Sequence, residues 1–315
     1  MSQLATAVVF ESPGNLSLRE VGLPDCDPAD CLVEVDWSGI STGTERLLWD
    51  GRMPPFPGLN YPLVPGYESV GRVIAAGCKS SIEPGSLVFV PGSRGFEDVA
   101  GLFGGAARQL VVNSSRLIPL APTTGAEGVL LALIATAIHA VRRFDTQGTP
   151  ELIVGHGVLG RLVARVCAAL GEPPTAVWET DPCRREGDYA YPVIDPETDT
   201  SSKYARICDV SGDAAILREL MPQLEKQGCI VLAGFYHQPI TFDFSIAFMA
   251  EANLRIAAEW QPEDLELAQT LLQDERVDVA DLITHRYAAR EAAPAYDIAF
   301  SDPECLKMIL DWRSL

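Results

Sequence analysis

A glycine-rich stretch, GHGVLG at residues 155–160, constrains the fold of this chain more than any other feature. Its glycines have the spacing G-x-G-x-x-G, the apolar run ELIV precedes them, and a segment with helical periodicity, GRLVARVCAALG, overlaps their end. In a strand–turn–helix unit, the first glycine permits a tight turn and the second lets the backbone approach a pyrophosphate. The third allows the helix to pack closely on the strand. The motif therefore predicts a dinucleotide-binding unit.

The rest of the chain shows two different patterns of predicted secondary structure. Up to about residue 120, short β-rich runs are separated by Gly and Pro, which predicts a compact, partly closed β unit. After Glu151, short apolar strands alternate with helical segments, among them AAILRELMPQLEKQG at 214–228, and from Ile283 the chain again reads as strand and turn. Such alternation is typical of a parallel sheet covered on both faces by helices. We therefore expect an α/β protein with a β-rich domain (1–121 and 284–315) and a doubly wound Rossmann domain (122–283).

The predicted cofactor site consists of the glycine loop, the start of the following helix and one acidic residue. The helix N-terminus offers unpaired N–H groups to phosphates. Glu179 ends the second strand, about twenty residues beyond the loop, where a carboxylate accepts hydrogen bonds from an adenosine ribose and repels a 2′-phosphate. NAD is therefore favoured over NADP, although Arg184 and Arg185 follow closely and weaken that preference. The expected cofactor-binding residues are Gly155, Gly157, Val158, Leu159, Gly160 and Glu179.

Net charge excludes several classes of partner. The chain has 24 Lys and Arg against 43 Asp and Glu, a net charge of -19, and such an acidic surface repels nucleic acid and anionic lipid. Apolar length excludes a membrane span as well, because the longest apolar run, GVLLALIATAIHAV, is shorter than the roughly 20 residues that a span requires. The N-terminus lacks a signal-peptide pattern. The eight cysteines are scattered without a C-x-x-C pair, as is typical of reduced core residues. We expect a cytoplasmic protein with no nucleic-acid partner and no integral membrane segment, and a homo-oligomer is compatible with the sequence.

Two stretches before residue 80 carry a family resemblance. ISTGTERLLWDG (40–51) and VPGYESVGRV (64–73), followed by the Rossmann unit, resemble the zinc-ligand motifs G-I-C-G-T-D and G-H-E of the medium-chain dehydrogenase/reductase superfamily. Aligning the glycine and threonine of the first motif places Thr42 at the cysteine and Glu45 at the aspartate, while Tyr67 stands at the histidine. The resemblance implies a GroES-like catalytic domain. Because a threonine hydroxyl and a neutral phenol are not usual zinc ligands, we expect a site without metal.

The proline-rich segment before residue 65 narrows the resemblance. The sequence STGTERLLWDGRMPPFPGLNYPLVPGYESVGRV, with the glycine loop, is similar to the zinc-free branch of this superfamily that acts in bacteriochlorophyll biosynthesis. That resemblance implies NAD-dependent oxidation of the 3-(1-hydroxyethyl) group of a bacteriochlorophyllide or chlorophyllide to an acetyl group. Two alternatives stay open: a zinc-free reductase of the quinone or enoyl type, and a non-catalytic pigment-binding protein.

Without a metal, a side chain must accept or relay the proton of the alcohol. Thr44 lies where the superfamily places a relay hydroxyl, and Tyr67 is expected to face the vacated metal position. Glu68 is an ionisable residue that burial could turn into a general base, and a carboxylate paired with a structural arginine is the other interpretation. The expected catalytic residues are Thr44, Tyr67 and Glu68.

A macrocycle with a propionate requires an apolar cleft with one or two basic residues. Aromatic side chains between residues 49 and 61 could form the wall and two nearby arginines could meet the carboxylate, or the same residues could fix an ordinary loop. His237 follows a strand whose carboxyl end faces the expected cofactor crevice. The expected substrate residues are Arg46, Trp49, Arg52, Phe56, Tyr61 and His237.

Overall fold

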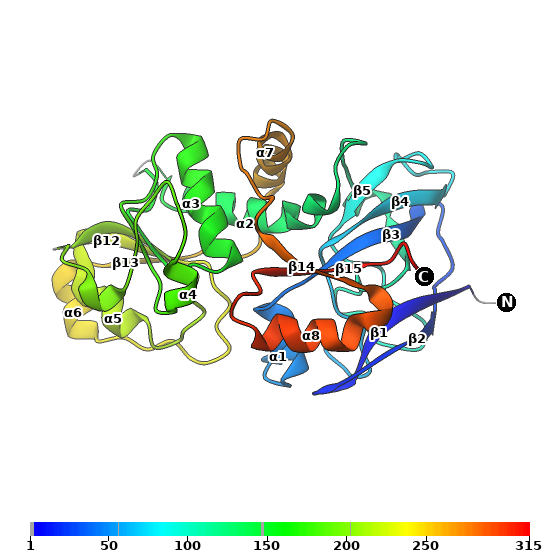
Figure 1. The fold of residues 1–315 in the computed structure, drawn as a ribbon, viewed down its shortest axis with the longest axis horizontal. Coiled ribbons are helices and arrows are strands. Elements are labelled where there is room, and N and C mark those ends of the chain that lie inside the picture. Colours follow the sequence, from blue (N-terminus) through cyan, green and yellow to red (C-terminus); the bar gives the residue numbers. More distant parts are fainter. Residues whose placement is uncertain (1–2, 56, 146–147, 202) are drawn as a thin grey trace. The chain divides into compact units, whose positions relative to one another are not determined.

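The chain folds as two compact units (Figure 1). The computed structural model describes residues 3–55, 57–145, 148–201 and 203–315. Unit 1 contains Met1–Leu131 and Ala280–Leu315, and unit 2 contains Ala132–Val279. The chain therefore leaves unit 1 once and returns to it to complete its sheet.

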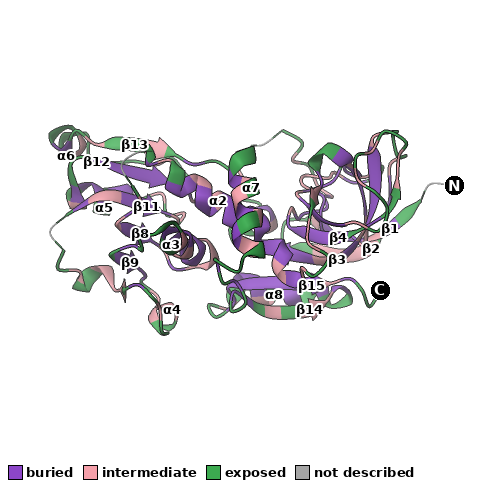
Figure 2. Cartoon of the chain, turned by 90° about the horizontal axis from the view of Figure 1, so that it is seen from above, coloured by how far each residue is buried: buried purple, intermediate pink, exposed green. Residues whose placement is uncertain are grey.

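Unit 1 is built on β-sheets whose buried residues form its core (Figure 2). Its larger sheet has seven strands in the order β14-β15-β3-β4-β5-β7, with β6 also paired to β3, and β1 pairs with β2. Valines on alternate positions of β3, such as Val33 and Val35, are fully buried, because β-branched side chains pack well on a pleated surface. The strands are β1 (Leu4–Ser12), β2 (Asn15–Gly22), β3 (Asp30–Ile40), β4 (Ser69–Ala76), β5 (Leu87–Val90), β6 (Gln109–Asn113), β7 (Ile118–Pro119), β14 (Ile283–Ala288) and β15 (Lys307–Asp311).

Helix α8 (Ala292–Ser301) corrects the expectation of strand and turn from Ile283 onward. That expectation is right for β14 and wrong for the next segment, whose buried residues Ala292, Ala295, Tyr296 and Ala299 have helical spacing. A proline at the third helical position is tolerated because the first turn has no internal N–H partners. The other helical segments of unit 1 are α1 (Thr44–Trp49) and the 3-10 turns η1 (Ser114–Arg116), η2 (Ala126–Leu130) and η5 (Ala289–Glu291).

Unit 2 contains a six-stranded, all-parallel sheet in the order β10-β9-β8-β11-β12-β13. The first strand in sequence lies in the middle, and the order reverses between β8 and β11, which is the doubly wound arrangement. The strands are β8 (Leu152–Val154), β9 (Ala176–Trp178), β10 (Val193–Ile194), β11 (Tyr204–Asp209), β12 (Leu224–Leu232) and β13 (Asn253–Ile256). The helices are α2 (Leu131–Arg142), α3 (Val158–Leu170), α4 (Pro182–Arg185), η4 (Pro196–Thr198), α5 (Leu217–Gln223), α6 (Phe244–Ala250) and α7 (Pro262–Gln273). No helix among the described residues is both long and apolar enough to cross a membrane.

The helix predicted over residues 214–228 is half as long as expected. Helix α5 ends at Gln223, and the residues from Leu224 onward form β12. Pro222 lies in the last turn of α5 and disfavours a further helical turn. The following residues instead pair with β11 on one side and β13 on the other.

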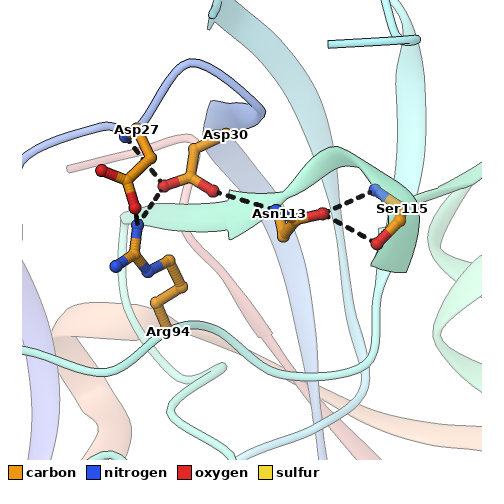
Figure 3. Close-up of polar contacts among 5 residues, drawn as sticks. All are labelled: Asp27, Asp30, Arg94, Asn113 and Ser115. Carbon is orange, nitrogen blue, oxygen red and sulfur yellow. Dashed lines mark hydrogen bonds and ion pairs between the residues drawn. The ribbon is translucent and has the colours of Figure 1, made fainter. Parts of the chain in front are cut away.

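A polar network joins separate segments of unit 1 (Figure 3). The Arg94 guanidinium contacts both Asp27, at 2.6 Å, and the buried Asp30 at the start of β3. The second carboxylate oxygen of Asp30 accepts from the Asn113 amide at 3.4 Å, and Asn113 in turn accepts from the Ser115 hydroxyl at 2.7 Å. These contacts hold the loop before β3 against the end of β6.

Candidate active site

The glycine loop of unit 2 has a geometry that other residues cannot adopt. Gly155 follows β8 with a φ of 99°, in the left-handed region that side chains disfavour. A Cβ placed on Gly160, in the first turn of α3, would lie 1.9 Å from the carbonyl oxygen of Gly155. Gly157 is the N-cap of α3, whose first two residues are Val158 and Leu159. The loop therefore brings the backbone and the helix N-terminus to the edge of the sheet where a pyrophosphate would fit.

Glu179 lies against this loop, at the end of the strand that neighbours β8. One of its carboxylate oxygens accepts from the His156 backbone N–H at 2.9 Å, and the other accepts from Asp181 N–H, also at 2.9 Å. Arg185 forms an ion pair with Asp195 at 3.0 Å, so its charge is partly neutralised. Arg184 comes closer to the loop, because its guanidinium would lie 3.8 Å from a Cβ on Gly157. The carboxylate and one arginine are thus both beside the loop.

His156, a loop residue that the sequence did not single out, ties the loop to the segment around Arg184 and Tyr191. Its Nδ1 lies 2.8 Å from the Arg184 carbonyl oxygen and its Nε2 lies 3.1 Å from the Tyr191 hydroxyl. The ring also meets the edges of Tyr189 and Tyr191 at 4.7 and 5.7 Å between centroids. Burial lowers the pKa of His156 to about 4, so the imidazole is neutral near pH 7. The two closely spaced tyrosines in GDYAYPV were the sequence feature that could have indicated an aromatic contact with this histidine.

In unit 1, the ends of two paired strands bring together a cluster of hydroxyl groups. Ser38 of β3 is opposite Ser69 of β4, so the residues after β3 lie near those before β4. The Tyr67 hydroxyl donates to Ser41 Oγ at 2.7 Å, and Thr44 N–H donates to the same oxygen at 3.3 Å. Burial, followed by the neighbouring Glu68, raises the pKa of Tyr67 above its usual value, so the phenol is neutral at physiological pH. The structure thus brings Thr44 and Tyr67 together around a serine.

The residue that meets Tyr67 is Ser41, whereas Thr42 was expected at this position. Thr42 lies partly exposed in the turn between β3 and α1, and Ser41 is buried. Thr42 is at the cysteine of the G-I-C-G-T-D motif only when the alignment starts from Gly43 and Thr44 without an insertion. Counting forward from Gly39 and Ile40 instead places Ser41 at the cysteine of that motif, with one extra residue before Gly43, and Ser41 is the residue that contacts Tyr67.

Glu68 is fully buried and forms an ion pair with Lys307 of β15, at 2.6 Å between Oε2 and Nζ. Lys307 also donates to the carbonyl oxygen of Ile40 at 3.2 Å. Glu68 is therefore paired with a basic residue, as one of its two interpretations expects, but that residue is a lysine and not an arginine. Among the described residues, the second carboxylate oxygen of Glu68 has no hydrogen-bond partner. Gly39 is required here, since a Cβ at that position would lie 2.4 Å from Oε2 of Glu68.

A second buried carboxyl group, Glu45, supports the cluster. Its Oε1 accepts from Ser41 N–H at 3.0 Å, and its Oε2 accepts from the Tyr296 hydroxyl at 2.8 Å. Burial raises the pKa of Glu45 to about 7, against the lowering effect of these two donors. Glu45 therefore holds the backbone of Ser41, while Tyr67 contacts the side chain of Ser41.

The titration of Glu45 gives a testable dependence of stability on pH. Between pH 4.5 and about 7 the folded state keeps a proton that the unfolded state has released, so this contribution is present below pH 4.5 and is lost as the pH rises through about 7. It amounts to about 3 kcal/mol at most. Relative to Glu45→Gln, the wild-type free energy of unfolding should fall across this window. Parallel curves for the two proteins in chemical unfolding from pH 4.5 to 8 would contradict this expectation.

The side chains of this cluster do not fit a zinc ion. Structural and catalytic zinc sites use thiolate, imidazole and carboxylate ligands. Here Ser41 and Tyr67 donate and accept within their own hydrogen bonds, and Lys307 already neutralises Glu68. In the described part of the chain, no group of three or more His, Cys, Asp or Glu residues is arranged to hold a metal ion.

The expected substrate residues of unit 1 are largely engaged with their own unit. The Trp49 ring packs at 5.3 Å from Phe10, and the Tyr61 hydroxyl donates to the carbonyl oxygen of Leu48. Arg46 and Arg52 both contact Asp50, at 3.8 Å for Arg46, and about half of each arginine side chain stays exposed. Phe56 lies outside the described residues. His237 belongs to unit 2, where it is partly exposed in the bend after β12.

Comparison with known sequences gives matches over nearly the whole chain. The alcohol dehydrogenase GroES-like domain matches residues 27–122. A 2-desacetyl-2-hydroxyethyl bacteriochlorophyllide A dehydrogenase of Rhodobacter capsulatus is 51% identical over 307 residues, 97% of this chain and 98% of the relative. The enzyme of the same name from Cereibacter sphaeroides is 51% identical over 314 residues, 98% of each chain.

Solved structures with the same fold cover both units. A short chain alcohol dehydrogenase from Escherichia coli CFT073, complexed with NADH, is 20% identical with a TM-score of 0.83, covering 98% of this chain and 99% of its own. A dehydrogenase from Sinorhizobium meliloti 1021 bound to NADP is also 20% identical, with a TM-score of 0.81 and the same coverage. The predicted fold class, a GroES-like domain with a Rossmann domain, is confirmed.

Proposed function

Since this chain belongs to the family of 2-desacetyl-2-hydroxyethyl bacteriochlorophyllide A dehydrogenases, we propose that it oxidises the hydroxyethyl group of a bacteriochlorophyllide to an acetyl group with NAD as the acceptor. The 51% identity over almost the full length of both relatives carries this conclusion. It favours a dehydrogenase over a quinone or enoyl reductase and over a pigment carrier. Bound NAD supplies the hydride acceptor.

The residues of unit 2 would hold the cofactor by its pyrophosphate and ribose. Gly155, Gly157 and Gly160 leave room for the pyrophosphate, and the N–H groups of Val158 and Leu159 lie at the positive end of α3. Glu179 has one carboxylate oxygen on the loop, at His156 N–H, and the other on Asp181 N–H, and from this position it can accept from a ribose hydroxyl and repel a 2′-phosphate. This charge supports NAD as the cofactor.

The residues of unit 1 would handle the proton of the alcohol. The neutral Tyr67 phenol orients the substrate oxygen, and Thr44 relays the proton away from it. Glu68 is the competing candidate for proton acceptor, although its charge is already paired with Lys307. The half-exposed Arg46 and Arg52 are the proposed partners of the propionate, with Trp49 and Tyr61 supporting the loop that presents them.

Turnover of purified protein tests this function. With 2-desacetyl-2-hydroxyethyl bacteriochlorophyllide A and NAD, we expect NADH to appear together with the acetyl pigment. Consumption of NADPH with an enone, without oxidation of the alcohol, would identify a reductase instead. Pigment binding without turnover in either direction would identify a carrier.

Cofactor preference should depend on the charge of Glu179. The wild type is expected to prefer NAD strongly, and Glu179→Gln should reduce the NAD-to-NADP ratio of kcat/KM by at least roughly tenfold, because a like-charge repulsion at close range is removed. Arg184, beside the loop, should then meet the 2′-phosphate. The matched control is Glu186→Gln, an exposed carboxylate on the same segment, which should leave the ratio unchanged. Equal kcat/KM with both cofactors in the wild type would refute the assignment.

Metal analysis should find no stoichiometric zinc in the active protein. The donor atoms of the cluster are hydroxyl groups and a carboxylate paired with a lysine, so activity should survive treatment with a chelator. The measurement is elemental analysis beside a turnover assay, before and after chelation. Finding about one zinc per chain that is lost together with activity would contradict this expectation.

A further inference from the structure

Ser41 lies at the centre of the hydroxyl cluster, and two contacts hold its backbone in place. It is the first residue after β3, whose last residue, Ile40, is paired with Met308 of β15. Its backbone N–H is held by the buried Glu45 at 3.0 Å, and its side chain is only slightly exposed. The backbone that carries the Ser41 hydroxyl is therefore held in place, and the hydroxyl itself is restrained by its bonds to Tyr67 and Thr44.

The hydrogen bonds of Ser41 determine the direction of those made by Tyr67. A serine hydroxyl has one proton and two acceptor lone pairs. Its oxygen accepts from the Tyr67 hydroxyl at 2.7 Å and from Thr44 N–H at 3.3 Å, so both acceptor positions are filled. The phenolic proton is therefore directed to Ser41, and the Tyr67 oxygen, which also forms a side-chain hydrogen bond with Thr44, keeps one lone pair to accept from a third group.

An alcohol and a ketone differ in the hydrogen bond that they can make with such an oxygen. An alcohol O–H can donate to it, whereas a carbonyl oxygen has no proton to donate. A phenol whose own proton is engaged elsewhere therefore binds the alcohol and is a poor partner for the ketone. The edge of Phe103, at 5.1 Å between ring centroids, restrains the phenol ring further.

Resting on the dehydrogenase function proposed above, we infer that Ser41 is a positioning residue that presents the Tyr67 oxygen as an acceptor to the substrate alcohol. Ser41 thereby favours the hydroxyethyl substrate over the acetyl product. It acts through Tyr67 and makes no contact with the reacting carbon itself.

A double-mutant cycle tests this role. Ser41→Ala should lower kcat/KM about two- to tenfold, the range of one neutral hydrogen bond. It should also weaken the binding of the alcohol relative to the ketone. The ratio of KM for the alcohol to the inhibition constant of the acetyl product should therefore rise. In a Tyr67→Phe background, Ser41→Ala should cause almost no further loss. Ser41→Thr, which keeps the hydroxyl, should restore most of the loss, and Thr42→Ala is the neighbouring control that should change neither quantity.

Losses that add in the double variant would overturn the inference, because Ser41 would then act independently of Tyr67. A readout that needs no turnover separates this failure from a failure of the proposed function. In protein carrying tyrosine labelled with carbon-13 at Cζ, the Tyr67 signal is the one that Tyr67→Phe removes. Ser41→Ala should shift that signal and Thr42→Ala should not. An unshifted signal refutes the role of Ser41, whereas a shifted signal in a protein without alcohol oxidation refutes only the dehydrogenase function.

Discussion

Replacing Lys307 with methionine is expected to lower the free energy of unfolding by about 3–5 kcal/mol. The side chains of Lys307 and Glu68 are almost completely inaccessible to solvent and lie 2.6 Å apart. Methionine keeps most of the length of the lysine side chain, so the main change is that Glu68 is left charged and buried without a partner. Chemical unfolding at pH 7, followed by circular dichroism, measures the difference.

Two controls separate charge from packing in this experiment. Adding Glu68→Gln to Lys307→Met removes the stranded charge and should recover much of the lost stability, because a buried ion pair replaced as a whole often costs little. Lys226→Met breaks an exposed pair with Glu251, at 3.1 Å, and should cost less than about 1 kcal/mol. Equal losses for Lys307→Met and Lys226→Met would contradict the importance of burial.

Removing either hydroxyl group of the proposed proton path is expected to lower turnover at least roughly tenfold, since acid–base assistance is typically worth about 100- to 10,000-fold. The variants are Thr44→Val and Tyr67→Phe. For Thr44→Val the loss should appear in kcat more than in KM, since a relay acts mainly in the transition state, whereas Tyr67→Phe should also raise KM because the Tyr67 oxygen accepts from the substrate alcohol. Thr44→Ser keeps a hydroxyl and should cost much less. Steady-state kinetics with the hydroxyethyl pigment gives both constants.

The competing role of Glu68 as general base needs a paired variant. Glu68→Gln alone would strand the buried charge of Lys307, so a loss of activity could reflect unfolding. Glu68→Gln with Lys307→Met removes the carboxylate charge without stranding the lysine. If this variant is folded and inactive while Thr44→Val and Tyr67→Phe keep near-normal turnover, the base is Glu68 and the hydroxyl relay is wrong.

The fold was predictable where local sequence and packing agree. The loop at 155–160 has a strand before it and a helix after it, and each of its outer glycines is required by the backbone. The segment after Pro222 was not predictable in the same way, because its residues have a helical pattern but pair with β11 and β13. Pairing with strands far away in the sequence outweighed the local preference.

The candidate site was predictable in its location and less so in its contacts. Thr44 and Tyr67 were expected to lie together, and the pairing of β3 with β4 brings them together. The choice between Ser41 and Thr42 could not be made from the sequence, since both carry a hydroxyl and only the end of β3 decides which one faces Tyr67. Lys307 stands in the apolar run LKMIL, and no local pattern links it to a glutamate 239 residues earlier.

The position of β15 between β14 and β3 has a consequence for biosynthesis. A nascent chain emerges from the ribosome with its N-terminus first, and domains generally fold in the order in which they emerge. Here the N-terminal residues of unit 1 emerge first. Until Lys307 has been translated, their sheet lacks strand β15 and the buried Glu68 has no counter-charge. Unit 2, Ala132–Val279, is complete before that. We therefore expect the nascent chain to acquire protease resistance first in unit 2 and only afterwards in the N-terminal β-strands.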